Sequence, residues 1–439
     1  MSFPRYERYK HSGVEWLGEV PEHWAIGPLY SLGTEREESN AGLIDDNLLS
    51  LSYGRIIRKD ISASDGLLPE SFETYQIVHV GDIIFRLTDL QNDKRSLRTA
   101  IASERGIITF AYVAFAPRAI LPAYLNYLLR DYDLRKVFYS MGGGVRQSMK
   151  FEDIRRLPTL VPSKQEQSAI AYFLCHETAK IDALIEEQRR LINLLEEKRH
   201  AVISHVITKG LNPKATMKDS RIDWLGEVPV DWSVAPVAYR YEVQLGKMLD
   251  TLKITGKNLK PYLRVFDVQW GEINIVDLPQ MDFDRIAQQK FRLQPGDLLV
   301  NEGGSYPGRC AIWKADVECY YQKALHRLRP LDSEIDTARF FFYIMSWAVN
   351  AGVFIAGGNE ATIEHLPAER LRRYRFAFPP LEEQIEIAEF LDSESRRFDL
   401  LKIEARSLID FLQERRSALI SAAVTGKIDL RNYTPKEAP

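Results

Sequence analysis

Two long stretches of the chain carry apolar residues at the spacing of a coiled coil. From Gln165 to Ile207 no Pro or Gly interrupts the sequence, and two core positions recur every seven residues. At 1.5 Å per residue, about 42 residues of helix would extend for ~63 Å, longer than a small globular domain. The pattern therefore predicts a long spacer helix. The expected core residues are Ile170, Leu184 and Leu191 at one position and Leu174, Ile181, Leu195 and Val202 at the other.

The same pattern returns with an offset of 217 residues, as from Gln167 to Gln384, and ends before Gly426. Polar interruptions recur as well: Glu177 and Glu394 match, and so do Lys198 and Arg415. A buried polar residue can fix the register of a coiled coil; alternatively, these side chains lie at frayed or broad parts of the interface. We expect the two helices to pack antiparallel about a pseudo-twofold axis. The second set of core residues is Ile387, Leu401 and Leu408, with Leu391, Phe398, Leu412 and Leu419.

A second repeat shows that the whole chain is duplicated. The segment WLGEVPEHW at residues 16–24 recurs as WLGEVPVDW at residues 224–232, with seven of nine residues identical. Each half therefore has a Trp-flanked motif, a variable region and a helical stretch in the same order. The order is also circular, because the motif that follows the first helix has its twin at the N-terminus. We expect the two terminal segments to meet and to build the same junction that residues 208–232 build.

The variable regions carry strand signals, namely β-branched and aromatic runs around Gly-Asp turns such as Gly81-Asp82 and Gly296-Asp297. Helical stretches follow, so each region is expected to be a mixed α and β domain. The predicted fold class is α+β, with two such domains, two long antiparallel coiled-coil helices and an internal duplication. The expected divisions are a junction at 1–24, a first domain at 25–160, a central spacer helix at 161–210, a junction at 211–232, a second domain at 233–378, a C-terminal spacer helix at 379–427 and a tail at 428–439.

Composition and motifs exclude several classes of protein. Apolar residues make up 45% and charged residues 27% of the 439 residues, as in ordinary globular proteins. Apolar runs fall short of the ~20 residues that span a bilayer, and no signal peptide is recognisable, so we expect a soluble, cytoplasmic protein. The three cysteines form no CxxC pair, which indicates neither a disulfide framework nor a zinc site.

No catalytic pattern is recognisable either. Gly246-Lys247 and Gly426-Lys427 lack the upstream Gly and the following Ser or Thr of a phosphate-binding loop. HExxH, GxSxG and EF-hand patterns do not occur, and the eight His residues show no metal-ligand spacing. We therefore expect no catalytic residue, no metal site and no cofactor in this chain.

Two similar but non-identical domains on a twofold-related pair of helices suit the reading of two separated sites on duplex DNA. Several segments then carry a specific resemblance: the two WLGEVP motifs, PPLEEQ at 379–384 with IAEFL at 387–391, and RRSALI at 415–420. In the second variable region GKML at 246–249, GDLL at 296–299 and YQKALHR at 321–327 add to it. Over nearly its whole length, the chain resembles the DNA-specificity subunit of type I restriction-modification systems.

The resemblance implies two target recognition domains that read the halves of a bipartite, asymmetric target, with the helices setting the spacer. It also implies partners: double-stranded DNA, two methyltransferase subunits that use S-adenosylmethionine, and endonuclease/translocase subunits that use ATP and Mg. The chain itself would then be a non-catalytic subunit with no membrane partner. An alternative from another class is a non-catalytic protein-interaction scaffold whose coiled coil bridges two binding modules.

Candidate DNA contacts follow from residue chemistry, because Arg reads guanine, Asn or Gln reads adenine and Lys anchors phosphate. The net charge of −3 hides two locally basic stretches, at 86–98 and 247–264. Alternatives are solvated loops for the basic stretches, an ion pair with Glu302 or Asp297 for the two arginines at 309 and 327, and a packed loop aromatic for Tyr306. The candidates are Arg86, Asn92, Lys94, Arg95 and Arg98 in the first domain, and Lys247, Lys257, Asn258, Tyr306, Arg309, Lys323 and Arg327 in the second.

Overall fold

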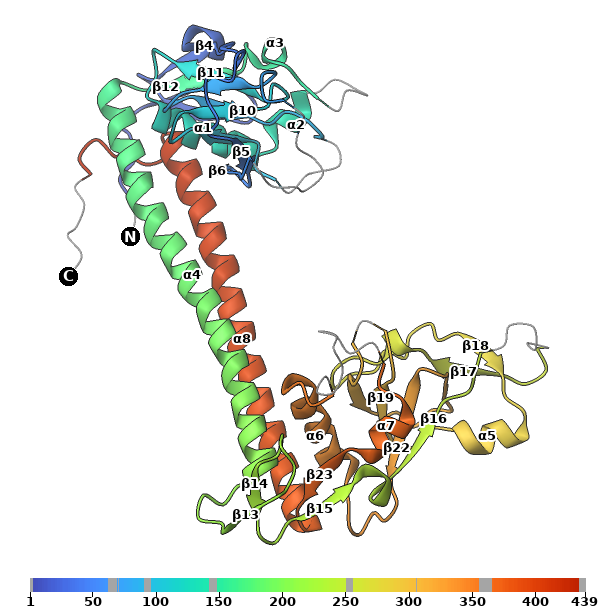
Figure 1. Cartoon of the computed structure of the whole chain (residues 1–439). Coiled ribbons are helices and arrows are strands. Elements are labelled where there is room, and N and C mark those ends of the chain that lie inside the picture. The colour runs from blue at the N-terminus through green and yellow to red at the C-terminus, as the bar shows by residue number, and fades with distance from the viewer. Residues whose placement is uncertain are drawn as a thin grey trace. The chain divides into compact units, whose positions relative to one another are not determined.

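The computed structural model shows two compact units (Figure 1). The first unit comprises Met1–Arg189 and Arg406–Pro439, and the second unit comprises Arg190–Ala405. Each unit holds one mixed α and β domain and parts of the two long helices, which confirms the predicted α+β class. The residues that the structure describes are 3–61, 69, 71–90, 96–141, 148–249, 256–304, 306–354 and 365–433.

The domain of the first unit is built on a four-stranded antiparallel sheet in the order β4-β11-β8-β9. Its central strands are β11 (Val113–Pro117) and β8 (Ile83–Phe85), and its edge strands are β4 (Gly33–Glu35) and β9 (Thr99–Ile101). Helix α1 (Pro122–Leu134) packs against β9. The remaining elements are β1 (Tyr9–His11), β2 (Glu19–Pro21), β3 (Ala25–Pro28), β5 (Leu49–Ser52), β6 (Arg55–Arg58), β7 (Gln76–Val78), β10 (Gly106–Ile108), β12 (Pro158–Val161), α2 (Val137–Met141), α3 (Phe151–Ile154) and a short 3-10 helix at Leu29–Ser31.

The domain of the second unit repeats this topology. Its sheet has the order β16-β22-β19-β20, with β22 (Leu325–Pro330) and β19 (Leu298–Asn301) at the centre and β16 (Tyr241–Leu245) and β20 (Cys310–Ile312) at the edges. Helix α6 (Ala338–Asn350) takes the place of α1. The remaining elements are β13 (Met217–Asp219), β14 (Glu227–Pro229), β15 (Ser233–Pro236), β17 (Leu259–Leu263), β18 (Gln280–Asp282), β21 (Tyr320–Tyr321), β23 (Arg375–Phe378), α5 (Arg285–Phe291), α7 (Ala368–Arg373) and 3-10 helices at Val237–Tyr239 and Val265–Asp267.

The terminal segments meet in the first unit, as the circular repeat predicts. The backbone N–H of Asp429 donates to the carbonyl oxygen of Pro4 at 2.8 Å, and the Tyr9 hydroxyl donates to the carbonyl oxygen of Gly426 at 3.0 Å. A Cβ on Gly426, whose φ is +71°, would collide with Pro21 of the WLGEVP motif. Gly210 occupies the same place beside the second copy of that motif.

Two long helices, α4 (Lys164–Lys209) and α8 (Leu381–Val424), contribute to both units. Within each unit their segments run side by side in opposite directions (Figure 1). In the first unit Ile181 and Ile185 pack with Leu412. In the second unit the guanidinium of Arg199 pairs with Asp399 at 2.8 Å. The predicted antiparallel packing is therefore confirmed within each unit.

At one of the two predicted core positions, Ile170 and Ile387 are buried as expected, but the predicted register is wrong further along each helix. Leu184 and Leu191 are 46% and 41% exposed, and their counterparts Leu401 and Leu408 are 37% and 42% exposed. The contact instead uses the neighbouring residue, such as Ile185 beside Leu184. Leu184, Leu191 and Leu408 are each followed by an isoleucine, so an apolar pattern shifted by one residue also fits the sequence there; Leu401 is followed by Lys402.

Two of the polar residues that interrupt the apolar pattern do not lie between the helices. Lys198 and Arg415 are exposed, so they are surface residues and not buried register markers. The polar residues between the helices are ion-paired instead: Arg416 with Asp182 at 2.9 Å, and Lys402 with Glu196 at 3.7 Å. None of the helices in the described ranges is both long and apolar enough to cross a membrane.

Candidate nucleic-acid interface

Four candidate residues of the second domain gather around one pair of loops. Gly246 follows β16 at a point where any Cβ would collide with the carbonyl group of Gln322, so only glycine allows this approach. The backbone N–H of Lys247 donates to Tyr321 at 3.1 Å, and the backbone N–H of Lys323 donates to Lys247 at 2.6 Å. Two lysines that are distant in sequence thus stand side by side.

Asp282, at the end of β18, holds the other two candidates beside this pair. Its carboxylate accepts the backbone N–H of Gly256 at 3.0 Å and that of Asn258 at 2.8 Å. Its carbonyl oxygen accepts the Lys247 ammonium at 2.6 Å. Lys257 and Asn258 are exposed on the segment that Asp282 anchors. Together the two loops present a basic and amide-bearing surface.

Two lysines of this cluster are available to an anion. Lys257 and Lys323 are exposed, and neither ammonium group has an acceptor among the residues that the structure describes. The Lys247 ammonium, by contrast, also stands 4.9 Å from the ring centroid of Phe283 and is half-buried. Phosphate anchoring therefore suits Lys257 and Lys323, whereas Lys247 stabilises the loops.

Arg309 and Tyr306 form a second candidate group. The Arg309 guanidinium stacks on the Tyr306 ring at 3.9 Å and donates to the amide oxygen of Gln269 at 2.5 Å. Tyr306 is exposed, so it is not a packed loop aromatic. Stacking on an aromatic ring holds a guanidinium in a defined orientation, as base reading by Arg requires.

An adjacent stacked pair was missed in the sequence. The Arg264 guanidinium lies 4.0 Å from the ring centroid of Phe266, which is 62% exposed. Two hydrogen bonds to the Asp267 carboxylate, at 2.9 Å each, hold it in place and raise its pKa. Arg264 is the last residue of the basic stretch 247–264, and this position in the sequence could have indicated it as a candidate DNA contact. The exposure of Phe266 cannot be read from the sequence.

Arg327 has a structural role, which corrects its place among the candidate DNA contacts. Its side chain is buried, and it donates to the Glu242 carboxylate at 2.7 Å and to the carbonyl oxygen of Lys290 at 3.2 Å. The alternative partners were also wrong, because Asp297 pairs with Arg329. Arg327 lies on β22, a central strand of the sheet, and is therefore inside the domain. Residue composition does not reveal this position.

Arg98 of the first domain is likewise structural. Its side chain has no exposed surface, and it donates to the Tyr139 hydroxyl at 3.1 Å and to the carbonyl oxygens of Thr88 and Asp89 at 2.9 and 3.2 Å. It therefore fastens a loop to the domain and does not face a ligand. Arg86 is half-buried, after β8. Asn92, Lys94 and Arg95 lie outside the described residues.

The helices add apolar surface to these polar groups. In the first unit Leu184, Leu408 and Phe411 are exposed, and in the second unit Leu191 and Leu401 are exposed. In each helix the leucines are seven residues apart, so they share one helix face. Large exposed apolar side chains in such an arrangement are typical of a protein-protein contact.

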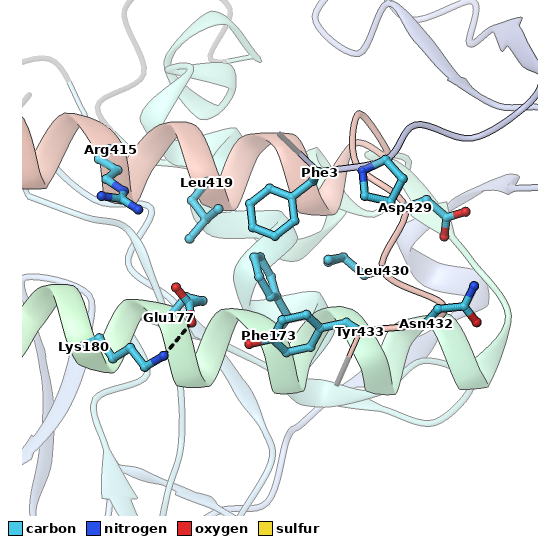
Figure 2. A pocket seen from close by; sticks show the side chains of 11 residues that line it. Phe3, Phe173, Glu177, Lys180, Arg415, Leu419, Asp429, Leu430, Asn432 and Tyr433 are labelled. Atoms are coloured by element: carbon cyan, nitrogen blue, oxygen red, sulfur yellow. Dashed lines mark hydrogen bonds and ion pairs between the residues drawn. The ribbon is translucent and has the colours of Figure 1, made fainter. Parts of the chain in front are cut away.

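A cavity of about 440 Å³ lies where the terminal segments meet the helices of the first unit (Figure 2). The ring of Phe173, from α4, makes edge contacts with Phe3 at 5.2 Å and with Tyr433 at 4.7 Å. Glu177 and Lys180 form an ion pair of 3.0 Å at its rim. The cavity therefore belongs to the junction of the two terminal segments. In the part of the chain that the structure describes, no cluster of His, Cys, Asp or Glu could hold a metal ion.

Known proteins resemble this chain in sequence. Residues 242–408 match the family described as the type I restriction modification DNA specificity domain. A Methanocaldococcus jannaschii protein, named as the MjaX specificity subunit of a type I restriction enzyme, is 21% identical over 98% of this chain and 99% of its own length. The StySPI specificity subunit of a type I restriction enzyme from Salmonella potsdam is 23% identical over 94% of this chain and 90% of its own length.

Solved structures share the fold. A chain from a study of complex assembly and conformational transition in the type I R-M system superposes with a TM-score of 0.63 at 17% identity, covering 92% of this chain and 98% of that chain. The HsdS subunit of Thermoanaerobacter tengcongensis gives 0.55 at 15% identity, covering 95% and 99%. The resemblance seen in the sequence is thus confirmed: the chain is similar to the DNA-specificity subunits of type I restriction-modification systems.

Proposed function

We propose that this chain reads a bipartite, asymmetric DNA target for a type I restriction-modification complex, one half-site with each domain. The observation that carries the proposal is the duplication: two sheets of the same strand order, β4-β11-β8-β9 and β16-β22-β19-β20, bear different surface residues. Equal scaffolds with different surfaces suit a ligand whose two halves are alike in backbone and unlike in sequence. The names of the relatives support the same reading.

In the second domain we assign the contacts by chemistry. Lys257 and Lys323 neutralise backbone phosphates, because they are exposed lysines without an acceptor among the described residues. Arg309, stacked on Tyr306, and the exposed amide of Asn258 contact base edges. In the first domain Asn92, Lys94 and Arg95 remain candidate contacts by residue type alone.

The remaining activities are assigned to partners. Two methyltransferase subunits, which use S-adenosylmethionine, bind the exposed apolar faces of α4 and α8, and endonuclease/translocase subunits that use ATP and Mg join through them. The chain itself is a non-catalytic, cytoplasmic subunit without a cofactor. The helices α4 and α8 set the distance between the two half-sites.

The test uses the full chain copurified with its methyltransferase partner. Retention on duplex DNA should fall steeply as salt rises, because each neutralised phosphate contributes roughly 0.9 to the slope of log K against log salt. Methylation profiling of DNA exposed to the complex should then show one bipartite motif. A complex that assembles but has no salt-sensitive affinity for DNA would identify the chain as a protein-interaction scaffold.

A further inference from the structure

A second cavity of the first unit, of about 370 Å³, is lined by an excess of positive charge. It lies among β6, β9, α1 and the two long helices. Three guanidinium groups line it: Arg55 from β6, Arg130 from α1 and Arg416 from α8. This cavity is separate from the loops assigned to DNA contact in the second domain.

In the described part of the chain, only one carboxylate lines the cavity beside these three guanidinium groups. Asp182 of α4 pairs with Arg416 at 2.9 Å and reaches Arg55 at 3.7 Å. Within the described residues Arg130 has no carboxylate at ion-pair distance, and its guanidinium donates to the carbonyl oxygen of Gly54 at 2.6 Å. Three cations thus face one anion inside a concave site.

The structure holds Arg130 in this place at a cost. Burial, followed by repulsion from Arg416, lowers the pKa of Arg130 to about 10. Its Nε and the amide oxygen of Asn126 are buried without a hydrogen-bond partner among the described residues. Gly54, with φ at +74°, leaves the space that the guanidinium fills, since a Cβ there would lie 2.7 Å from its nitrogens. Such like-charge crowding is relieved by an anion.

The second unit provides an internal comparison. Its equivalent helix pair, Arg199 with Asp399 at 2.8 Å, is present, and Lys402 adds a second cation. Lys402 is matched by two carboxylates, Asp399 at 3.3 Å and Glu196 at 3.7 Å. Two cations and two carboxylates are therefore balanced at this described position of the second unit, whereas the cavity of the first unit has three cations and one carboxylate.

The counterpart of Arg130 in the second unit is Ser346. The N–H group just before α1 donates to Gln167, and the N–H group just before α6 donates to the repeated Gln384, so the two helices start at equivalent positions. Counting from there, Ser346 stands where Arg130 stands. The duplicated chain thus contains the same local scaffold with and without the buried cation.

We propose that the cavity lined by Arg55, Arg130 and Arg416 is a binding site for a phosphate group. Guanidinium groups bind phosphate oxygens through paired, charge-assisted hydrogen bonds, and three of them around one cavity exceed what Asp182 can neutralise. The phosphate of a DNA strand and that of a small ligand share this chemistry. The site does not depend on the proposed DNA reading by the second domain.

The first arm of the test titrates the full chain with pyrophosphate at constant ionic strength by calorimetry. We expect one saturable site, with affinity reduced at least about tenfold by Arg130→Ser, which copies the second unit. Arg55→Ser, whose side chain is 75% exposed, should reduce the affinity to a similar extent. Arg189→Ser, an exposed charge-matched change on α4, should bind as the wild type does. Absence of saturable binding to the wild type, or equal binding by all variants, would overturn the proposal.

The second arm identifies the source of the phosphate. If a DNA strand fills the site, Arg130→Ser and Arg55→Ser should weaken duplex binding equally for target and non-target sequences and lower the salt slope by about one. If a small ligand fills it, pyrophosphate binding falls and duplex binding stays unchanged. Loss of methyltransferase association without any pyrophosphate binding would instead point to a partner's carboxylate and refute a phosphate site. None of these results would contradict the proposal that the wild-type chain reads a DNA sequence.

Discussion

Glu166 shows how one side chain can bind a helix to a neighbouring motif. It stands in the first turn of α4, where its carboxylate accepts from Trp24 at 3.1 Å, contacts His23 at 2.8 Å and accepts the Ser163 hydroxyl at 2.7 Å. Burial raises its pKa, but these hydrogen bonds outweigh burial and lower the pKa to about 2. The ionised form is therefore favoured by folding.

Its counterpart in the repeat behaves in the opposite way. Glu383 accepts from Trp232 at 3.0 Å, as Glu166 does from the equivalent tryptophan, but Asp231 stands where the first motif has His23. Burial raises the pKa of Glu383, and the nearby carboxylates raise it further. Two changes, Asp231 in place of His23 and Pro380 in place of Ser163, thus accompany a reversal of the pKa shift at an otherwise repeated contact.

We therefore expect opposite effects of the same substitution. At pH 7, Glu166→Gln should lower the free energy of unfolding by on the order of 1–2 kcal/mol, allowing for solvent screening at the half-exposed His23. Because its folded pKa lies below the ordinary 4.5, this stabilisation is present above about pH 4.5 and is lost as the pH falls toward about 2. Urea unfolding between pH 7 and pH 2.5 measures the difference.

Glu383→Gln is the matched control. Because the folded pKa of Glu383 is raised, its ionised form costs stability above that pKa, and the substitution should leave stability at pH 7 unchanged or slightly increased. Equal losses for both variants would show that the hydrogen bonds to tryptophan, and not the contact with His23, decide stability.

The exposed lysines of the second domain carry a separate prediction. Lys257→Ala and Lys323→Ala should each weaken DNA binding to target and non-target duplexes alike and lower the salt slope by about one, as expected of phosphate contacts. Fluorescence anisotropy at several salt concentrations measures both quantities. Lys10→Ala, on β1 of the first unit, serves as the control. A change in target preference would mean that these lysines read bases.

At the scale of the helices, substitutions of buried apolar residues should affect folding stability, and substitutions of exposed apolar residues should affect assembly with a partner. Ile181→Ala and Leu412→Ala remove buried side chains between α4 and α8, which should lower the free energy of unfolding by about 2–4 kcal/mol. Leu184 and Leu408 lie on the exposed face, so Leu184→Ala and Leu408→Ala should change the free energy of unfolding by less than about 0.5 kcal/mol.

The second pair of variants should nevertheless weaken association with the methyltransferase partner, because they remove apolar surface from the proposed contact. Denaturant unfolding and gel filtration with the partner measure the two effects. If Leu184→Ala and Leu408→Ala assemble with the partner as the wild type does, this face is not the contact.

The helices also show where sequence reasoning succeeds and where it stops. Periodicity and the absence of Pro and Gly predicted both helices, since these signals act along the chain. The register failed at Leu184 because Ile185 stands beside it and both are apolar. Choosing between them requires knowledge of the partner helix, which the pattern of one helix does not contain.

The candidate site has the same limit. Lys257 and Asn258 lie on the surface as their stretch of basic and amide residues predicted. Arg98 and Arg327 carry the same chemistry, but sheet and loop packing enclose them. Residue type predicts what a side chain can bind, and only tertiary structure decides whether a ligand can reach it.

At the scale of the whole molecule, the duplication predicts that target specificity is divisible. Replacing residues 25–160 with the corresponding domain of a relative should change one half-site and preserve the other, because each domain has its own sheet and core. Methylation profiling of the exchanged protein identifies both half-sites. A change in both would contradict independent reading.

The proposed ruler role of the helices has its own test. Inserting seven residues after Leu191 and after Leu408 keeps the helix periodicity and adds ~10.5 Å to each helix. At ~3.4 Å per base pair this corresponds to about three extra spacer pairs, with a rotation of roughly a hundred degrees that can abolish binding instead of shifting it. Methylation of the original target with its original spacer by the intact variant complex would refute the role.

The junction between the two terminal segments has a consequence for chain connectivity. One peptide segment builds it in the second unit, whereas two segments joined only by contacts such as Asp429 to Pro4 build it in the first. The order of elements in the fold is therefore circular, and the chain could begin at either of two equivalent junctions. A circular permutant in which a short linker joins the two terminal segments, and which opens after Gly210 instead, should retain the helices and strands of the described ranges. The position of the opening then decides which of the two domains is synthesised first.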